Sequence, residues 1–197
     1  MRNDSLRLFI AIEIEKRIKE RILEFLNQLK ETDVRIRWMA YENLHVTVKF
    51  IGDVDPIILP SLVKSLESVA SRCRPFRIQI GNVAVFPTAK RPRILFVGLG
   101  DKENNLVNIF EEVETEIEEF GIKRELRKYV GHITIGRIKS QKNIHKILEL
   151  LPSYSDRFFG QETVNHITLK QSELTPKGPI YSTLNRFTLY KNEYRNH

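Results

Sequence analysis

The sequence predicts an α+β protein built from two copies of one strand–helix–strand unit. Three observations favour this fold class. Apolar runs rich in β-branched residues alternate along the chain with segments whose apolar residues recur at helical spacing. A short basic loop joins two strongly alternating runs, 76–86 and 93–100, which is typical of antiparallel strands. The pattern of the first half of the chain also reappears in the second half.

The expected elements follow one another with no low-complexity stretch and no obvious linker between them. Strands are expected over 5–14, 34–38, 44–52, 76–86, 93–100 and 132–139, with closing strands over 163–174 and 181–192. Amphipathic helices are expected over 15–30, 53–73 and 102–120, with a shorter helix over 141–151. Asp55 is the expected N-cap of the second helix, because Pro56 then lies in its first turn. We interpret residues 1–197 as one domain of two lobes.

The internal repeat has one offset throughout. His132 follows His45 by 132 − 45 = 87 residues. The same offset relates Leu95 and Phe96 to Leu8 and Phe9, and Ile109, Phe110 and Val113 to Ile22, Leu23 and Leu26. The two copies span about 5–52 and 93–139. Two copies of one unit usually pack about a pseudo-two-fold axis, so we expect equivalent positions to face each other across it.

Each copy ends in a His-x-Thr motif, formed by His45 with Thr47 and by His132 with Thr134. Ten threonines in 197 residues give about 0.2 such pairs by chance, and three occur, because His166 with Thr168 is a further example. A lone strand histidine is more often a half-buried residue with a satisfied hydrogen bond than a functional one. The repeat therefore favours a function for the first two motifs. His166 lies outside the repeat, and we interpret it as an ordinary strand residue.

The paired motifs suit displacement at phosphorus. Side chains at i and i+2 of a strand share a face, so each strand offers an imidazole beside a hydroxyl, while Val46, Val48 and Phe50 face the other side. One neutral imidazole can accept a proton from the attacking oxygen while one imidazolium donates a proton to the leaving oxygen. Two hydroxyls can donate hydrogen bonds to the non-bridging oxygens. We expect no metal and no cofactor, because the motifs contain no further metal ligand.

Other side chains are candidates for substrate binding. Lys49 is expected on the face of His45 and Thr47, whereas strict alternation turns Arg137 away from His132 unless a β-bulge intervenes. Two basic segments, "AKRPR" (89–93) and "KRELRKY" (123–129), could follow an RNA backbone, and charge runs of this kind are more often only solvated. The aromatic residues that could stack on bases are Phe86 and Tyr129.

Composition restricts the partners and the compartment. A net charge of +7 and a pI of about 9.5 favour a polyanionic partner such as RNA, DNA or nucleotides. The single Cys73 excludes an intramolecular disulfide and disfavours a cysteine-based zinc site. No apolar run approaches the roughly 18 residues of a membrane span, and the first apolar run is broken by Glu13 and Glu15. We expect a cytoplasmic monomer without a membrane partner.

The motifs and their flanks resemble a known family. Two His-x-Thr-x motifs, the lead-in "W…LHVTVKFIG" (38–52), "HITIGR" (132–137) and the final "SELTPKGPIYSTLNRFTLY" (172–190) are similar to the two-histidine (2H) phosphoesterases. Within these, the likeness is to the RNA 2′,3′-cyclic phosphodiesterases, also called 2′-5′ RNA ligases. The resemblance implies a bilobal α+β fold with two antiparallel sheets around a V-shaped cleft, and metal-independent chemistry.

The resemblance also implies residue roles. It makes His45 the proton donor and His132 the acceptor that activates water, with Thr47, Thr134 and Arg137 on the phosphate. The symmetric motifs themselves do not decide which histidine is the acid. The expected function is hydrolysis of RNA 2′,3′-cyclic phosphate ends to 2′-phosphomonoesters, with 2′-5′ ligation as the reverse direction. The alternative is a non-catalytic RNA-binding module that holds phosphate with the same side chains.

Overall fold

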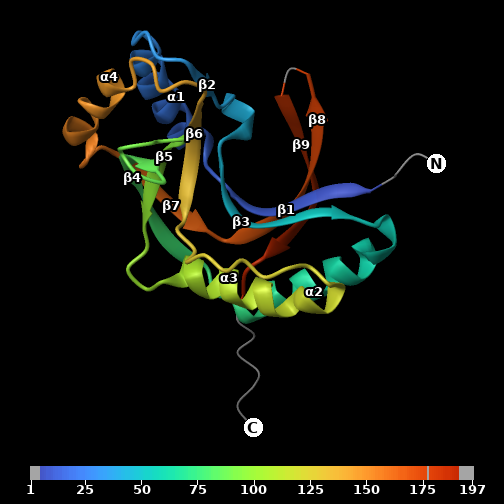
Figure 1. The fold of residues 1–197 in the computed structure, drawn as a ribbon. Helices are drawn as coiled ribbons and strands as arrows, with labels where there is room; N and C mark the ends of the chain where they lie inside the picture. Colours follow the sequence, from blue (N-terminus) through green and yellow to red (C-terminus); the bar gives the residue numbers. More distant parts are fainter. Residues whose placement is uncertain (1–4, 177, 191–197) are drawn as a thin grey trace.

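The computed structural model describes residues 5–176 and 178–190 (Figure 1). Its strands are β1 (Leu6–Glu13), β2 (Ile36–Trp38), β3 (His45–Val54), β4 (Phe76–Phe86), β5 (Ile94–Gly100), β6 (His132–Ile138), β7 (Phe158–Val164), β8 (His166–Thr175) and β9 (Gly178–Thr188). Its α-helices are α1 (Lys16–Lys30), α2 (Leu59–Arg72), α3 (Asn105–Glu116) and α4 (His145–Leu148). Short 3₁₀ turns lie between several of these elements.

The strands form one antiparallel sheet in the order β7-β4-β5-β6-β3-β1-β8-β9, and β2 pairs with β6. The two halves of the sheet meet where β3 lies beside β6, and there the register holds a single pair, Val46 with Ile133. From this junction the two strands run in different directions, so the halves form two walls (Figure 1). The predicted α+β fold class is confirmed, and the antiparallel strands form one curled sheet rather than the two separate sheets that were expected.

The helices cover one face of the sheet, and each packs where its apolar stripe meets apolar strand residues. The buried residues of α1 are Ile18, Ile22, Phe25, Leu26 and Leu29, at helical spacing. Full burial of such a side chain contributes about 1.5–3 kcal/mol. The α1 helix contacts β7, where the rings of Phe25 and Phe159 lie 5.5 Å apart, whereas α3 contacts β3. The helix of each predicted copy thus packs on strands of the other half. The face without these helices is called the inner face below.

Several boundaries differ from the prediction. The edge strand β7 was missed, because "FFGQETV" contains a glycine and three polar or charged positions and is barely apolar on one face. The predicted strand 163–174 is divided between the end of β7 and β8. The short helix expected over 141–151 is only four residues, α4, followed by a 3₁₀ turn. Asp55 accepts a hydrogen bond from the backbone N–H of Ile57, but it caps the 3₁₀ turn Pro56–Ile58 rather than α2, whose N-cap residue is Ile58. Positions 191 and 192 of the last predicted strand lie outside the described residues.

None of the helices within residues 5–176 and 178–190 has the length and apolar character needed to cross a bilayer.

Candidate active site

The two His-x-Thr motifs lie beside each other at the centre of the sheet. β3 and β6 are antiparallel neighbours, and their register pairs Val46 with Ile133, both fully buried on the helix-covered face. Since alternate strand residues share a face, the His and Thr of each motif lie on the inner face, each His beside the Thr of the other motif. The side chains brought together in this way are His45, Thr47, His132 and Thr134.

Backbone carbonyls fix the orientation of both imidazoles. Nδ1 of His45 lies 2.8 Å from the carbonyl oxygen of Asn43, and Nδ1 of His132 lies 2.8 Å from that of Val130. A carbonyl only accepts, so each Nδ1 carries a hydrogen and donates it. Nε2 of each ring is therefore the nitrogen that can take up and release a proton. Nε2 of His45 lies 3.0 Å from the hydroxyl oxygen of Thr47.

Two aromatic rings pack against each imidazole. The rings and their centroid distances are Phe9 (5.1 Å) and Tyr181 (5.4 Å) at His45, and Phe86 (5.2 Å) and Phe96 (5.4 Å) at His132. Phe9 and Phe96 are 87 residues apart and occupy equivalent places in the two halves. From the sequence, Phe9 and Phe96 are included in the internal repeat but are not predicted to belong to the site. The signal was available, because both residues keep the same offset as the histidines.

Burial makes His45 a weak base. It lowers the pKa of His45 from its ordinary 6.5 to about 4, although the Asn43 carbonyl opposes this shift. Nearby positive charges lower the pKa further, from Lys170, Lys19 and His132 in that order. The coupling to His132 agrees with the two rings belonging to one site. At neutral pH, His45 is therefore neutral in the free protein.

His132 is affected in the same direction. Burial lowers its pKa below the ordinary value, the Val130 carbonyl raises it, and the positive charge of Arg137 lowers it. Both imidazoles are thus neutral at pH 7 until an anion enters. A phosphodiester between them would favour protonation, because an opposite charge stabilises the imidazolium.

The expectation that Lys49 shares the face of His45 and Thr47 is wrong. The register of β3 against β1 shifts by one residue at Val48, which is a β-bulge. Lys49 therefore turns to the helix-covered face, where it is only 6% exposed and its Nζ lies 2.5 Å from a carboxylate oxygen of Glu114 in α3. Phe50, expected on the apolar side, instead lies on the inner face and is 63% exposed.

Arg137 lies on the inner face because β6 also contains a bulge. The register of β6 against β5 shifts by one residue at Ile135, so Arg137 pairs with Ile94. Its side chain is exposed, and its charge lowers the pKa of both His132 and Tyr181. The bulge that sequence reasoning required for an inward Arg137 is present. It lies 87 residues after Val48, so the two bulges are equivalent in the two halves.

The remaining candidate residues either pack against other side chains or are exposed to solvent. Tyr129 is not available to stack on a base, because its ring stacks on Phe110 with centroids 4.7 Å apart and its hydroxyl donates to the Thr47 carbonyl at 3.0 Å. Phe86 stacks on Phe96 at 4.1 Å beside His132. The basic residues of the loop between β4 and β5 are all exposed: Lys90, Arg91 and Arg93.

His166 does not join the histidine pair. It begins β8, and its Nδ1 contacts the side-chain oxygen of Asn165, while its Nε2 lies 3.6 Å from a carboxylate oxygen of Glu13. It is nevertheless on the inner face, since β8 pairs with β1 beside β3.

Metal ligands do not gather at the site. Among the residues that the structure describes, no group of three or more His, Cys, Asp or Glu side chains could hold a metal ion.

An antiparallel sheet with two His-x-Thr motifs on adjacent central strands defines a two-histidine phosphoesterase. The chain belongs to the LigT-like phosphoesterase family, whose model matches residues 12–96 and again 97–181. The predicted family is confirmed.

Named relatives match over nearly their whole length. The RNA 2′,3′-cyclic phosphodiesterase of Methanocaldococcus jannaschii is 37% identical over 179 residues, which are 91% of this chain and 98% of the relative. The protein of the same name from Aquifex aeolicus is 36% identical over 93% of this chain and 97% of its own.

Solved structures share the fold. TT0787 of Thermus thermophilus matches with a TM-score of 0.80 at 24% identity, covering 95% of this chain and all of that one. Escherichia coli LigT complexed with 3′-AMP matches with a TM-score of 0.75 at 20% identity and the same coverage.

Proposed function

We propose that this chain hydrolyses the 2′,3′-cyclic phosphodiester at RNA ends to a 2′-phosphomonoester, with His45 and His132 as general acid and base. The observation that carries the proposal is the matched pair of imidazoles on adjacent strands, each with Nδ1 held by a carbonyl and Nε2 left for proton transfer. The relatives' name, RNA 2′,3′-cyclic phosphodiesterase, supports the choice of this substrate.

In the proposed reaction His132 Nε2 accepts a proton from water as the water oxygen attacks phosphorus. The bond between phosphorus and O3′ breaks on the opposite side, and O3′ takes the proton of His45 Nε2, leaving a 2′-phosphate and a 3′-hydroxyl. Each proton transfer is typically worth about 10²- to 10⁴-fold, or roughly 3–5 kcal/mol of barrier.

The family resemblance assigns the acid to His45, and one observation favours the same order. A group with a lower pKa is a stronger proton donor once it is charged, and His45 has the pKa near 4. The anionic substrate supplies the condition for that charge.

The hydroxyls of Thr47 and Thr134 and the guanidinium of Arg137 would donate hydrogen bonds to the non-bridging oxygens. Negative charge is concentrated on these oxygens in the transition state, so donors placed there lower the barrier. Arg137 brings two parallel N–H groups, which match two phosphate oxygens. The chemistry needs no metal ion in this scheme, because protons move through the histidines.

The reverse reaction would join a 5′-hydroxyl to the cyclic phosphate and form a 2′-5′ bond. It requires the 5′-hydroxyl nucleotide to take the place of water beside His132. A cavity of about 490 Å³ is lined by Phe158, by Gly131, which precedes His132, and by Phe96, whose ring packs on His132, and this is within the usual size of small-molecule sites. Hydrolysis dominates in solution because water is in large excess.

The test is incubation with adenosine 2′,3′-cyclic phosphate, with and without EDTA, followed by ³¹P NMR. We expect the 2′-monophosphate at the same rate in both samples. A non-catalytic RNA-binding module would give no product, and a metal-dependent hydrolase would stop with EDTA.

We also propose that the enzyme acts as a monomer in the cytoplasm. Its composition, with one cysteine and a strongly basic balance, supports a reducing compartment that contains RNA. Light scattering coupled to size-exclusion chromatography would contradict the monomer if it gave twice the mass of 23.2 kDa.

A further inference from the structure

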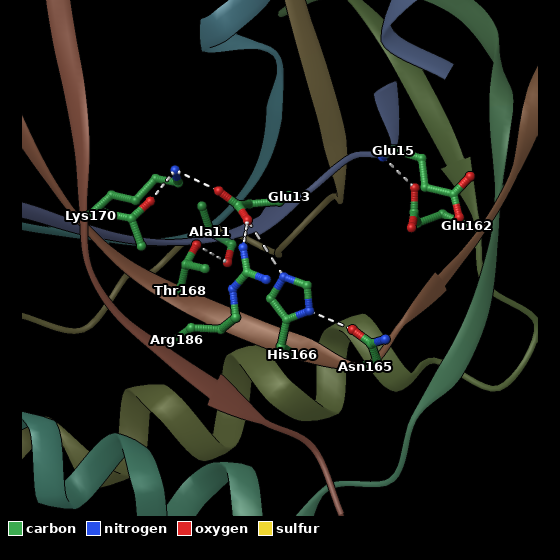
Figure 2. A network of polar contacts seen from close by, with 10 residues as sticks. Ala11, Glu13, Glu15, Glu162, Asn165, His166, Thr168, Lys170 and Arg186 are labelled. Atoms are coloured by element: carbon green, nitrogen blue, oxygen red, sulfur yellow. Dashed lines mark hydrogen bonds and ion pairs between the residues drawn. The ribbon is translucent and has the colours of Figure 1, made fainter. Parts of the chain in front are cut away.

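A charged network lies on the inner face beside His45 and is not used by the proposed reaction (Figure 2). The carboxylate of Glu13 accepts hydrogen bonds from Lys170 Nζ at 2.9 Å and from Arg186 Nη2 at 2.6 Å. Lys170 Nζ also donates to the Thr183 hydroxyl at 2.7 Å. Figure 2 shows the side chains of Glu13, Lys170 and Arg186 converging from β1, β8 and β9.

Strand register places the network next to the histidine pair. Glu13 is the direct partner of His45 between β1 and β3. Lys170 is the partner of Phe9 between β1 and β8, and the Phe9 ring packs on His45. The positive charge of Lys170 acts on His45 in the free protein. Lys170 therefore lies close enough to His45 for its charge to act on a ligand bound there.

The positive charges of the network outnumber its negative charges. Lys170 and Arg186 carry two positive charges against the single negative charge of Glu13. The neighbouring Lys19 of α1 is a further cation, opposed by the charges of Glu13 and then Glu42. The Arg186 side chain is 57% exposed, and one of its five N–H groups is used on Glu13. The carboxylate thus holds two cations in place while donors remain for an anion.

We infer that Lys170 and Arg186 bind the phosphate on the 5′ side of the terminal ribose, so that the enzyme selects cyclic ends of RNA strands over single nucleoside 2′,3′-cyclic phosphates. The inference rests on the proposed function. O3′ leaves with the proton of His45, so the terminal ribose lies on the His45 side of the reacting phosphorus. The strand then continues over β1, β8 and β9, and the first anion it brings is that 5′-phosphate. Arg and Lys are the usual partners of such phosphates.

The test compares two substrates that differ only in this group. They are adenosine 2′,3′-cyclic phosphate and the same nucleotide with a 5′-phosphate. For the wild type we expect kcat/KM to be about 10-fold higher with the 5′-phosphate, as a charge-assisted hydrogen bond would give. Arg186→Gln should remove most of this preference and change kcat/KM on the nucleoside by less than about 2-fold. For Arg186→Gln on the 5′-phosphorylated substrate, the slope of log(kcat/KM) against log of the salt concentration should become less steep by about one unit.

The matched control is Lys64→Gln, which removes one positive charge from an exposed position of α2. It should keep the wild-type preference. The inference is overturned if Arg186→Gln keeps the preference, if it lowers both rates equally, or if the wild type shows no preference.

A binding measurement separates this inference from the proposed function. Calorimetry would compare adenosine 2′-monophosphate with adenosine 2′,5′-bisphosphate, neither of which needs turnover. Tighter binding of the bisphosphate by the wild type, lost in Arg186→Gln, supports the subsite even if the enzyme hydrolysed neither cyclic substrate. Equal affinities would contradict the subsite while leaving hydrolysis intact.

Discussion

At the scale of single residues, the carbonyls of Asn43 and Val130 decide which nitrogen of each imidazole takes part in proton transfer. Replacing either His45 or His132 by alanine removes one Nε2 and should lower kcat by at least about 10²-fold. Both changes leave the strands intact, so circular dichroism should be unchanged. The measurement is the initial rate on adenosine 2′,3′-cyclic phosphate.

His166→Ala is the control for that prediction, because it removes a third His-x-Thr histidine from the same face of the sheet. Its rate on the nucleoside cyclic phosphate should stay within about 3-fold of wild type, since His166 faces Glu13 rather than the histidine pair. Loss of activity in His166→Ala with retention in His45→Ala would reverse the assignment.

The low pKa of His45 has a consequence for stability. An unfolded chain protonates this histidine near its ordinary pKa of 6.5, whereas the folded protein does so only near 4. Between these values the unfolded state binds more protons, so the free energy of unfolding falls as the pH falls through this window. Holding His45 neutral in the folded state should therefore lower the free energy of unfolding by about 2–3 kcal/mol at pH 4.5 relative to pH 7.

Urea unfolding at pH 7 and pH 4.5 measures this cost when wild type and His45→Gln are compared. The wild type should lose about 2–3 kcal/mol more than the variant on going to pH 4.5. An equal loss in the two proteins would mean that the folded state does not hold His45 neutral.

At the scale of elements, the two β-bulges mark where sequence reasoning failed. Alternation correctly placed Thr47 with His45 and Thr134 with His132, because the first three residues of each motif are regular strand. It failed after Val48, where the extra residue exchanges the faces of Lys49 and Phe50. A bulge has no reliable sequence signal, because it depends on the register of the neighbouring strand.

The internal repeat offers a partial way to predict the bulge in β3 from the sequence. A bulge was needed to turn Arg137 inward, and Phe50 is its equivalent 87 residues earlier. The same bulge in the first copy turns Phe50 inward and Lys49 outward. The hydrophobic periods of α1 and β4 were strong enough to predict their boundaries to within one residue. Which half each helix covers depends on long-range packing and did not follow from periodicity.

The bulge in β3 makes Lys49 a link between a strand and a helix. Its Nζ pairs with Glu114 of α3 and donates to the Lys123 carbonyl at 2.8 Å, and both side chains are almost fully buried. Lys49→Met leaves the Glu114 charge buried without its partner, which typically costs about 3–5 kcal/mol. Urea unfolding should show that loss, while kcat of the folded enzyme stays near wild type.

The double variant with Lys49→Met and Glu114→Leu tests the cause. It removes both charges, so it should recover much of the lost stability, as replacement of buried ion pairs often does. A Lys49→Met protein of normal stability that has a raised KM would instead return Lys49 to the substrate site.

At the scale of the whole molecule, the site exists only because the two halves meet. Each half supplies one histidine and one threonine, and the sheet joins them where β3 pairs with β6, with β2 of the first copy also paired with β6. The crossed packing of α1 and α3 ties the halves together on the outer face, as the contact of α1 with β7 and of α3 with β3 shows. A phosphate held by both motifs adds a second connection, on the inner face. Such a ligand should stabilise the molecule as one cooperative unit.

That expectation can be measured with adenosine 2′-monophosphate, the proposed product. A ligand at 100 times its Kd adds about 2.7 kcal/mol to the free energy of unfolding. For a chain of this size, this corresponds to a rise in Tm of roughly 5–10 °C. Thr47→Val and Thr134→Val, one from each half, should each reduce the rise, whereas Thr163→Val at an exposed position of β7 should not. If either of the first two variants kept the full shift, the ligand would be held by one half alone, and the two imidazoles would not share a phosphate.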